Sequence, residues 1–298
     1  MNNKILGRSI VIASFISTLI IMVVLVYMLF EIYSGGKSVL SWEFLTADPK
    51  EGMTAGGIFP AILGTVLLVL IMSIACVPVG TITAIYLNEY ANKNSIFTKM
   101  IRFAVNTLSG VPAIVFGLFG LGFFIQFVGG GVDKMFYGNQ LHWAQPNILW
   151  ASLTMAFLTI PVVIVTVEES LKTVPDELRA ASLALGATKW QTLRKVVIPN
   201  SISGILTGGI LAIGRGAGEV APILFTGVAY FLPHLPSGLT DQFMNLGYHI
   251  YVMSTQSTNV EETKAIQYAT AFVLLMCTFS LTFLAIIVRY QFRKKLKI

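Results

Sequence analysis

Residues 59–87 read FPAILGTVLLVLIMSIACVPVGTITAIYL and contain no charged side chain. A membrane-spanning helix needs about 20 predominantly apolar residues, so this stretch is long enough to cross a bilayer. The whole chain has the same character, because 55% of its 298 residues are hydrophobic and 11% are charged. A soluble domain carries roughly 25% charged residues. The composition therefore excludes a soluble protein and predicts an integral membrane protein whose surface is largely covered by membrane lipid.

Six segments with little or no charge are long enough to be membrane spans. They cover residues 10–30, 59–87, 103–128, 147–167, 202–231 and 265–288. The first is too long for a signal-peptide core and has no A-x-A cleavage site, so we interpret it as a membrane anchor. We predict an all-α membrane protein with six transmembrane helices in one domain at 10–288. A short N-terminus at 1–9 and a basic tail at 289–298 flank this domain.

The distribution of Lys and Arg predicts the orientation in the membrane. Four lysines lie on one face of the predicted spans: Lys37, Lys50, Lys134 and Lys264. Arg215 lies within a span, and the remaining 15 of the 20 basic residues lie on the face that has both termini. Cytoplasmic loops are enriched in Lys and Arg. Both termini are therefore predicted to be cytoplasmic, and the net charge of +6 reflects orientation rather than binding to nucleic acid.

The longest cytoplasmic loop, 168–200, has the pattern of two short helices. It contains VPDELRAASLALGATKWQTLRKVVIP at 174–199. Pro175 suits the first position of a helix, Gly186 ends that helix, and Pro199 ends the second one at the entry to the fifth span. An apolar stripe on the first helix consists of Leu178, Ala181 and Leu185. A generic amphipathic pair of this kind lies in the membrane interface or packs under its own bundle.

The fifth span is the one that carries charge. It contains GRGAGEVAP at 214–222, which places Arg215 near the middle of the span. An arginine at the bilayer centre costs at least about 2.5 kcal/mol, and such residues usually mark a transport pathway. Glu219 follows four residues later and is able to pair with it. Two interpretations stay open: an ion pair that only orients helices, and a site for an oxyanion that matches the planar donors of the guanidinium.

The cytoplasmic loop resembles the EAA loop of bacterial ABC importer permeases, which has a Glu-Ala-Ala-x-x-x-Gly core followed by an apolar residue and a proline. The core here is AASLALG at 180–186, with Ala180 in place of the glutamate and Glu177 one turn earlier. The resemblance implies an ABC type I importer permease fold and a coupling-helix loop that fits a groove on a dimeric cytoplasmic ATPase. The residues expected at this contact are Glu177, Leu178, Ala181, Leu185, Gly186, Ala187 and Trp190.

The charged segment resembles one branch of these importers, the phosphate-specific transport permeases, and more closely their A-type subunit. RGAGEVAP at 215–222 is similar to that branch's Arg-x-x-Gly-Glu-Thr-Ala-Pro, with Val220 in place of the threonine. AIYLNEY at 84–90 and SGVPAIVFGLF at 109–119 are further points of similarity. The resemblance implies a heterodimer with a sister phosphate permease in a bacterial cytoplasmic (inner) membrane. It also implies an extracytoplasmic phosphate-binding protein and a phosphate path past Arg215 and Glu219.

No pattern in the sequence indicates a catalytic residue or a metal site. His142, His234 and His249 lack ligand spacing, and Cys76 and Cys277 lie in apolar runs. A Walker phosphate loop is absent, so we expect no cofactor in this chain and ATP bound by the partner ATPase subunits. Two alternatives remain: a permease for another oxyanion, and a gradient-driven secondary anion transporter. The lack of a second Arg-x-x-x-Glu segment disfavours the repeats that are common in secondary transporters.

Overall fold

The computed structural model describes residues 2–50, 55–138, 140–232, 234–257 and 260–296. Within this part of the chain, six helical rods are long and apolar enough to cross a membrane, which confirms the predicted class. The rods are α1 (Asn2–Gly36), α3 (Phe59–Ile85) with the π-helical turn η2 (Tyr86–Tyr90), α5 (Ala113–Phe119) with η3 (Gly120–Gly129) and α6 (Gly130–Phe136), α7 (Ile148–Lys172), α9 (Lys189–Thr192) with η4 (Leu193–Val197) and α10 (Ile198–Gly218), and α12 (Val260–Leu296).

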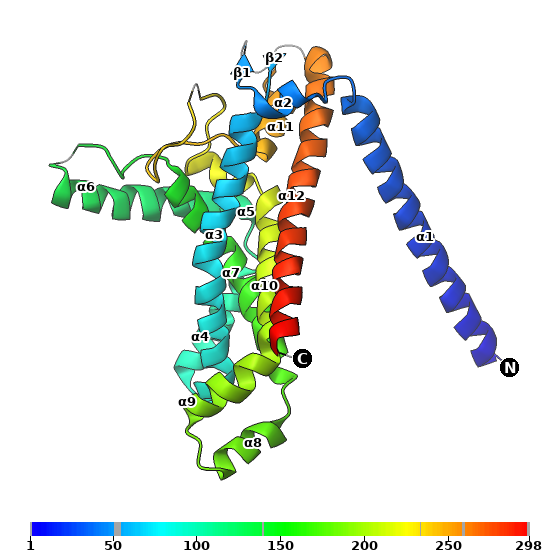
Figure 1. The fold of residues 1–298 in the computed structure, drawn as a ribbon, viewed down its shortest axis with the longest axis vertical. Helices are drawn as coiled ribbons and strands as arrows, with labels where there is room; N and C mark the ends of the chain where they lie inside the picture. The colour runs from blue at the N-terminus through cyan, green and yellow to red at the C-terminus, as the bar shows by residue number, and fades with distance from the viewer. Residues whose placement is uncertain (1, 51–54, 139, 233, 258–259, 297–298) are drawn as a thin grey trace.

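Shorter elements cover the two ends of the bundle. The upper end in Figure 1 has α2 (Trp42–Thr46), α11 (Leu246–Thr255) and a small antiparallel pair of strands, β1 (Pro49–Lys50) and β2 (Ala55–Gly56). The lower end has α4 (Ile96–Leu108) and α8 (Asp176–Ala184) next to α9. Both chain ends also lie toward the lower end (Figure 1). The two termini and the predicted coupling loop therefore share one side of the molecule.

The centre of the bundle is α7, which packs against α3 and α10. Most of its side chains are buried, and Ala151, Met155 and Val163 have no exposed surface. A helix that is apolar all round is expected to lie inside a bundle. Small residues let its neighbours approach closely: a Cβ added at Gly80 of α3 would lie 2.7 Å from Cγ1 of Val163. The α3–α7 crossing is thus closely packed at this position.

Helix α1 lies apart from the bundle. It diverges from α12 toward the lower end in Figure 1, and none of its apolar span is buried. The two helices meet near the upper end, where the rings of Tyr33 and Phe272 lie 5.5 Å apart and Gly36 packs on the backbone of Ala269. The apolar surface of α1 is available to lipid or to another subunit.

The third rod begins later than predicted. We expected a span at 103–128, but residues up to Leu108 belong to α4, and the rod itself runs over Ala113–Phe136. The break occurs because Gly110 and Pro112 interrupt the helix, and Pro112 has the extended ψ of 138°. In Figure 1, the rod that ends in α6 projects sideways from the bundle rather than along α3.

The fifth rod both begins earlier and ends earlier than the predicted span at 202–231. Pro199 does not end the second loop helix, because η4 leads into α10 without a break and Pro199 is the second residue of α10. At the other end α10 stops at Gly218. A 3₁₀ turn, η5 (Ala221–Phe225), then packs against α5. Closely spaced glycines and Pro222 account for the early end, since both residue types disfavour a helix interior.

We expect Gly204→Leu to destabilise the bundle. A Cβ at this position of α10 would overlap the side chain of Ser170 on α7. Overpacking of this kind costs about 1–3 kcal/mol. Thermal unfolding in detergent should therefore begin at a lower temperature than in the wild type. The control is Gly131→Leu, because a Cβ at Gly131 of α6 meets nothing within 4 Å. Equal unfolding temperatures for both variants would contradict this packing.

We also expect the packing of α11 on α12 to weaken in acid. His249 of α11 is 2% exposed, its Nδ1 lies 3.1 Å from Oγ1 of Thr270, and burial lowers its pKa to about 4. The unfolded chain takes up a proton near pH 6.5, so stability is complete above that pH and falls by up to about 3 kcal/mol as the pH drops toward 4.

His249→Gln should remove this loss of stability, because glutamine does not titrate. Melting temperatures measured between about pH 7 and pH 4.5 test the effect. The exposed His234 provides the control variant His234→Gln, which should keep the wild-type pH dependence. An unchanged pH dependence in His249→Gln would show that another group is responsible.

Candidate functional site

The predicted coupling loop folds into a helical hairpin, α8 and α9. Helix α8 starts at Asp176 after Pro175, which occupies the N-cap position, and it ends at Ala184. Gly186 has a φ of +84°, and the N–H groups of Gly186 and Ala187 donate to the carbonyls of Leu183 and Ser182. This is a Schellman C-cap, which favours glycine because of its left-handed backbone. The prediction that Gly186 ends the first helix is confirmed.

The second helix of the hairpin is directly continuous with a long rod. Thr188 and Gln191 form a reciprocal capping box at the start of α9. From α9 the chain continues through η4 into α10, and the uninterrupted rod covers Lys189–Gly218. The hydroxyl oxygens of Ser182 in α8 and Thr192 in α9 lie 2.9 Å apart, which connects the two arms. A force applied to the hairpin therefore acts directly on the rod.

The residues predicted at the ATPase contact lie on the surface of this hairpin. Helix α8 has no buried residue. Leu185 is 90% exposed and Trp190 is 58% exposed, and Leu178 is exposed as well. The other predicted positions are Glu177, Ala181 and Gly186, which are exposed, and Ala187, which is half-buried. Large apolar side chains that protrude into water typically mark a surface for a protein partner.

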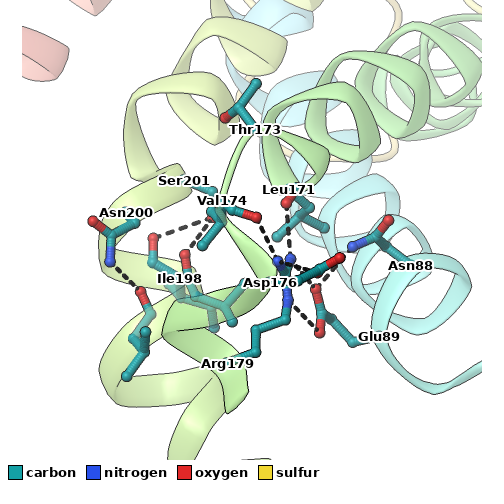
Figure 2. Close-up of polar contacts among 12 residues, drawn as sticks. Asn88, Glu89, Leu171, Thr173, Val174, Asp176, Arg179, Ile198, Asn200 and Ser201 are labelled. Carbon is teal, nitrogen blue, oxygen red and sulfur yellow. Dashed lines mark hydrogen bonds and ion pairs between the residues drawn. The ribbon is translucent and has the colours of Figure 1, made fainter. Parts of the chain in front are cut away.

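Behind the hairpin, two arginines connect four elements at the lower end of the bundle: α4, α7, α8 and η2. Arg102 of α4 donates to Glu168 of α7 at 2.7 Å and to the carbonyl of Leu87 at 3.3 Å. Glu168 is buried and lies 3.7 Å from the amine of Lys172. The second arginine is Arg179 of α8, which pairs with Glu89 of η2 (Figure 2). Sequence reasoning did not assign a role to these residues.

Both arginines face a charged cavity on the lower side of the bundle. The cavity has a volume of about 580 Å³. Its lining residues are Leu87, Asn88, Glu89, Lys93, Arg102, Glu168, Lys172, Asp176 and Arg179. The acceptor Glu89 belongs to the segment AIYLNEY, which the sequence comparison singled out without a role. In the sequence, the one signal for Glu89 is its position at the end of an uncharged stretch.

Arg215 lies in the last turn of α10 rather than in the middle of a span. Glu219 is the C-cap residue, with an extended ψ of 132°. The Nε atom of Arg215 lies 3.8 Å from Oε1 of Glu219, and the two side chains are 35% and 29% exposed. A cation at a helix C-terminus interacts favourably with the unpaired carbonyls. The predicted pair exists, but it is long and open rather than a closed bidentate bridge.

The side of α10 that bears Arg215 is not covered by the rest of the described chain. Leu211, one turn earlier, is 48% exposed, and a Cβ at Gly218 would meet nothing within 4 Å. The opposite side is packed, because Gly216 contacts the sulfur of Met72 in α3. Among the described residues, no hydrogen bond from the guanidinium is found. The guanidinium, whose side chain is 35% exposed, thus keeps donors available for a ligand or another subunit.

The described residues contain no group of three or more His, Cys, Asp or Glu side chains that could bind a metal ion. Cys76 is buried in the core, and Cys277 is half-buried on α12. Both thiols are free. These positions agree with a structural role for the two cysteines.

The six apolar rods define a multi-pass membrane protein that carries an exposed helical hairpin at one end. The family model of the binding-protein-dependent transport system inner membrane component matches residues 76–297. The chain belongs to this family of permeases, and it is a multi-pass inner-membrane protein and a transport subunit rather than an enzyme. The sequence-based resemblance to ABC importer permeases is confirmed.

The chain is also similar in sequence to individual named permeases. The phosphate transport system permease protein PstA of Yersinia pestis is 33% identical over 91% of this chain and 84% of its own length. PstA of Mycobacterium leprae is 36% identical over 70% of this chain and 65% of its own length. The probable ABC transporter permease protein YqgI of Bacillus subtilis is 34% identical, again over 70% and 65%. The aligned region thus spans about two thirds of the length of two of these three relatives.

Solved structures support the same fold at low sequence identity. A bacterial alginate ABC transporter chain superposes with a TM-score of 0.63 at 13% identity and covers 96% of this chain and 94% of its own. A chain of the MetNI methionine ABC transporter gives a TM-score of 0.54 at 17% identity, over 79% and 94%. The predicted fold of an ABC importer permease is therefore confirmed.

Proposed function

We propose that this chain is a permease subunit of an ATP-binding-cassette importer that moves inorganic phosphate into the bacterial cytoplasm. The observation that carries the proposal is the 33% identity with a phosphate transport permease over 91% of this chain. The open arginine at the end of α10 supports the same substrate. A guanidinium presents planar N–H donors that match the oxygens of phosphate.

The proposed ATPase partner binds the hairpin of α8 and α9. Support comes from the exposed apolar side chains of Leu178, Leu185 and Trp190. We infer that the ATPase is dimeric and binds the ATP, because the sequence of this chain has no phosphate-binding loop. Closure of the ATPase pushes on the hairpin, and the continuous rod from Lys189 to Gly218 carries that movement toward Arg215.

The proposed sister permease covers the two unpartnered apolar faces. One is α1, whose residues 7–30 are all exposed, and the other is the side of α10 that bears Leu211 and Arg215. In a heterodimer the second face would line the space between the subunits. Arg215 would then border a shared transport pathway, in agreement with the usual role of charges inside a membrane.

We place both termini and the hairpin in the cytoplasm. Support comes from the excess of Lys and Arg at the lower end of Figure 1, where both chain ends and α8 lie. The upper end, with α2, β1, β2 and α11, then faces outward (Figure 1). An external phosphate-binding protein would dock there.

We expect Arg215→Gln to reduce phosphate uptake strongly while the complex still assembles. Removal of a charged hydrogen bond costs about 1.5–3 kcal/mol, which corresponds to about a tenfold or larger loss. Uptake of labelled phosphate into vesicles that contain the whole transporter measures the effect. Arg215→Lys is the comparison variant, since it keeps the charge but loses the planar donors and should be intermediate. Wild-type uptake by Arg215→Gln would refute the role of Arg215.

We expect Gly186→Asp to uncouple ATP hydrolysis from transport. Aspartate at a φ of +84° is strained, and it adds a negative charge to the surface proposed to contact the ATPase. ATP hydrolysis should persist while phosphate uptake falls. The matched control is Gly138→Asp, because Gly138 also has a positive φ, is exposed and lies outside the coupling loop. If uptake and stimulated ATPase activity both stay normal in Gly186→Asp, the coupling assignment is wrong.

A further inference from the structure

The side chain of Arg179 belongs to α8, but most of its hydrogen bonds go to other elements. Nη2 donates to Oε1 of Glu89 at 2.8 Å and to the carbonyl of Leu171 at 2.9 Å. Nη1 donates to the carbonyl of Val174 at 2.5 Å and to Asp176 at 3.2 Å, and Nε lies 3.4 Å from Oε2 of Glu89. Figure 2 shows these contacts converging on one guanidinium.

Two of the acceptors, Leu171 and Glu89, lie at the lower ends of two core helices. The carbonyl of Leu171 belongs to the last turn of α7, where backbone carbonyls lack partners within the helix. Glu89 lies in η2, the turn that extends α3. The side chains of Arg179 and Glu89 are 17% and 16% exposed, so water screens their pairing less than that of surface charges. Arg179 therefore connects α8 to α3 and to α7 at the same time.

The other side-chain hydrogen bond of α8 within the described chain joins Ser182 to Thr192 of α9, and it does not reach α3 or α7. Helix α8 has no buried residue of its own. Cavities of about 580 Å³ and 220 Å³ lie beside it, and Glu89 and Arg179 line both of them. The neighbouring contact is weaker, with Nζ of Lys189 5.9 Å from the ring centre of Tyr90. Without Arg179, the cavities would leave α8 room to move relative to α3.

We propose that Arg179 is a positioning residue through which movement of α8 is transmitted to the lower ends of α3 and α7. The inference rests on the proposed importer function. Arg179 touches neither substrate nor nucleotide; it makes α8 and the two core helices move as one body. A lysine at this position would keep a charge for Glu89, but its single ammonium would not reach both Glu89 and the carbonyls of α7 in the same planar geometry.

The first test measures phosphate transported per ATP hydrolysed by the reconstituted complete transporter. In Arg179→Gln we expect assembly and ATP hydrolysis to persist and this ratio to fall about tenfold, with Arg179→Lys intermediate. The matched control is Lys93→Gln, which removes a positive charge from the same cavity at an exposed position and should keep the wild-type ratio. An unchanged ratio in Arg179→Gln overturns the proposal, as does an equal fall in uptake and hydrolysis.

The second test does not depend on the transported substrate. Spin labels are placed at the exposed positions Ala184 of α8 and Ile82 of α3, after Cys76 and Cys277 are replaced by alanine. The distance should stay constant on addition of ATP with Arg179 present, and it should change or broaden in Arg179→Gln. Identical distances in both proteins overturn the inference. If the distances behave as expected but no phosphate enters the vesicles, the proposed function fails and the inference about Arg179 stands.

Discussion

The structure depends on one constraint: backbone carbonyls at a helix end need a partner when little water can reach them. Arginines meet this need at the lower end of the bundle. Arg102 donates to the carbonyl of Leu87 in η2, the turn that extends α3, and Arg179 donates to that of Leu171 at the end of α7. Each also pairs with a carboxylate of another helix. The same contacts that complete the helix ends therefore hold the helices together.

Arg215 differs from these two arginines in both its location and its contacts. It lies in the last turn of its own helix, α10, and its nearby carboxylate is 3.8 Å away. Arg102 and Arg179 are used as structural connections, since they donate to carboxylates of other elements at 2.7 Å and 2.8 Å. The donors of Arg215 are open at a surface that the described chain leaves uncovered. The number of satisfied donors thus separates a structural arginine from one that is able to bind a ligand.

The sequence predicted the features that depend on local chemistry. Uncharged stretches predicted six spans because apolarity and length are local properties, and Gly186 predicted a helix end because a left-handed C-cap favours glycine. The boundaries at Leu108 and Gly218 were missed, since the residues beyond them are as apolar as those in the helices. The pairs Arg102–Glu168 and Arg179–Glu89 join residues far apart in sequence. Only the packing of the helices brings such charges together.

Because α10 ends early, Arg215 lies at the opposite end of one helical rod from the coupling loop. The rod from Lys189 to Gly218 has 30 residues, which corresponds to a length of about 45 Å. Trp190 lies at one end and Arg215 at the other, so a single rigid element runs from the exposed hairpin to the charged surface. Helix α8 is attached separately, through Arg179, to α3 and α7. The two arms of the hairpin therefore act on different helices, and a tilt of the hairpin would shift Arg215 relative to the core.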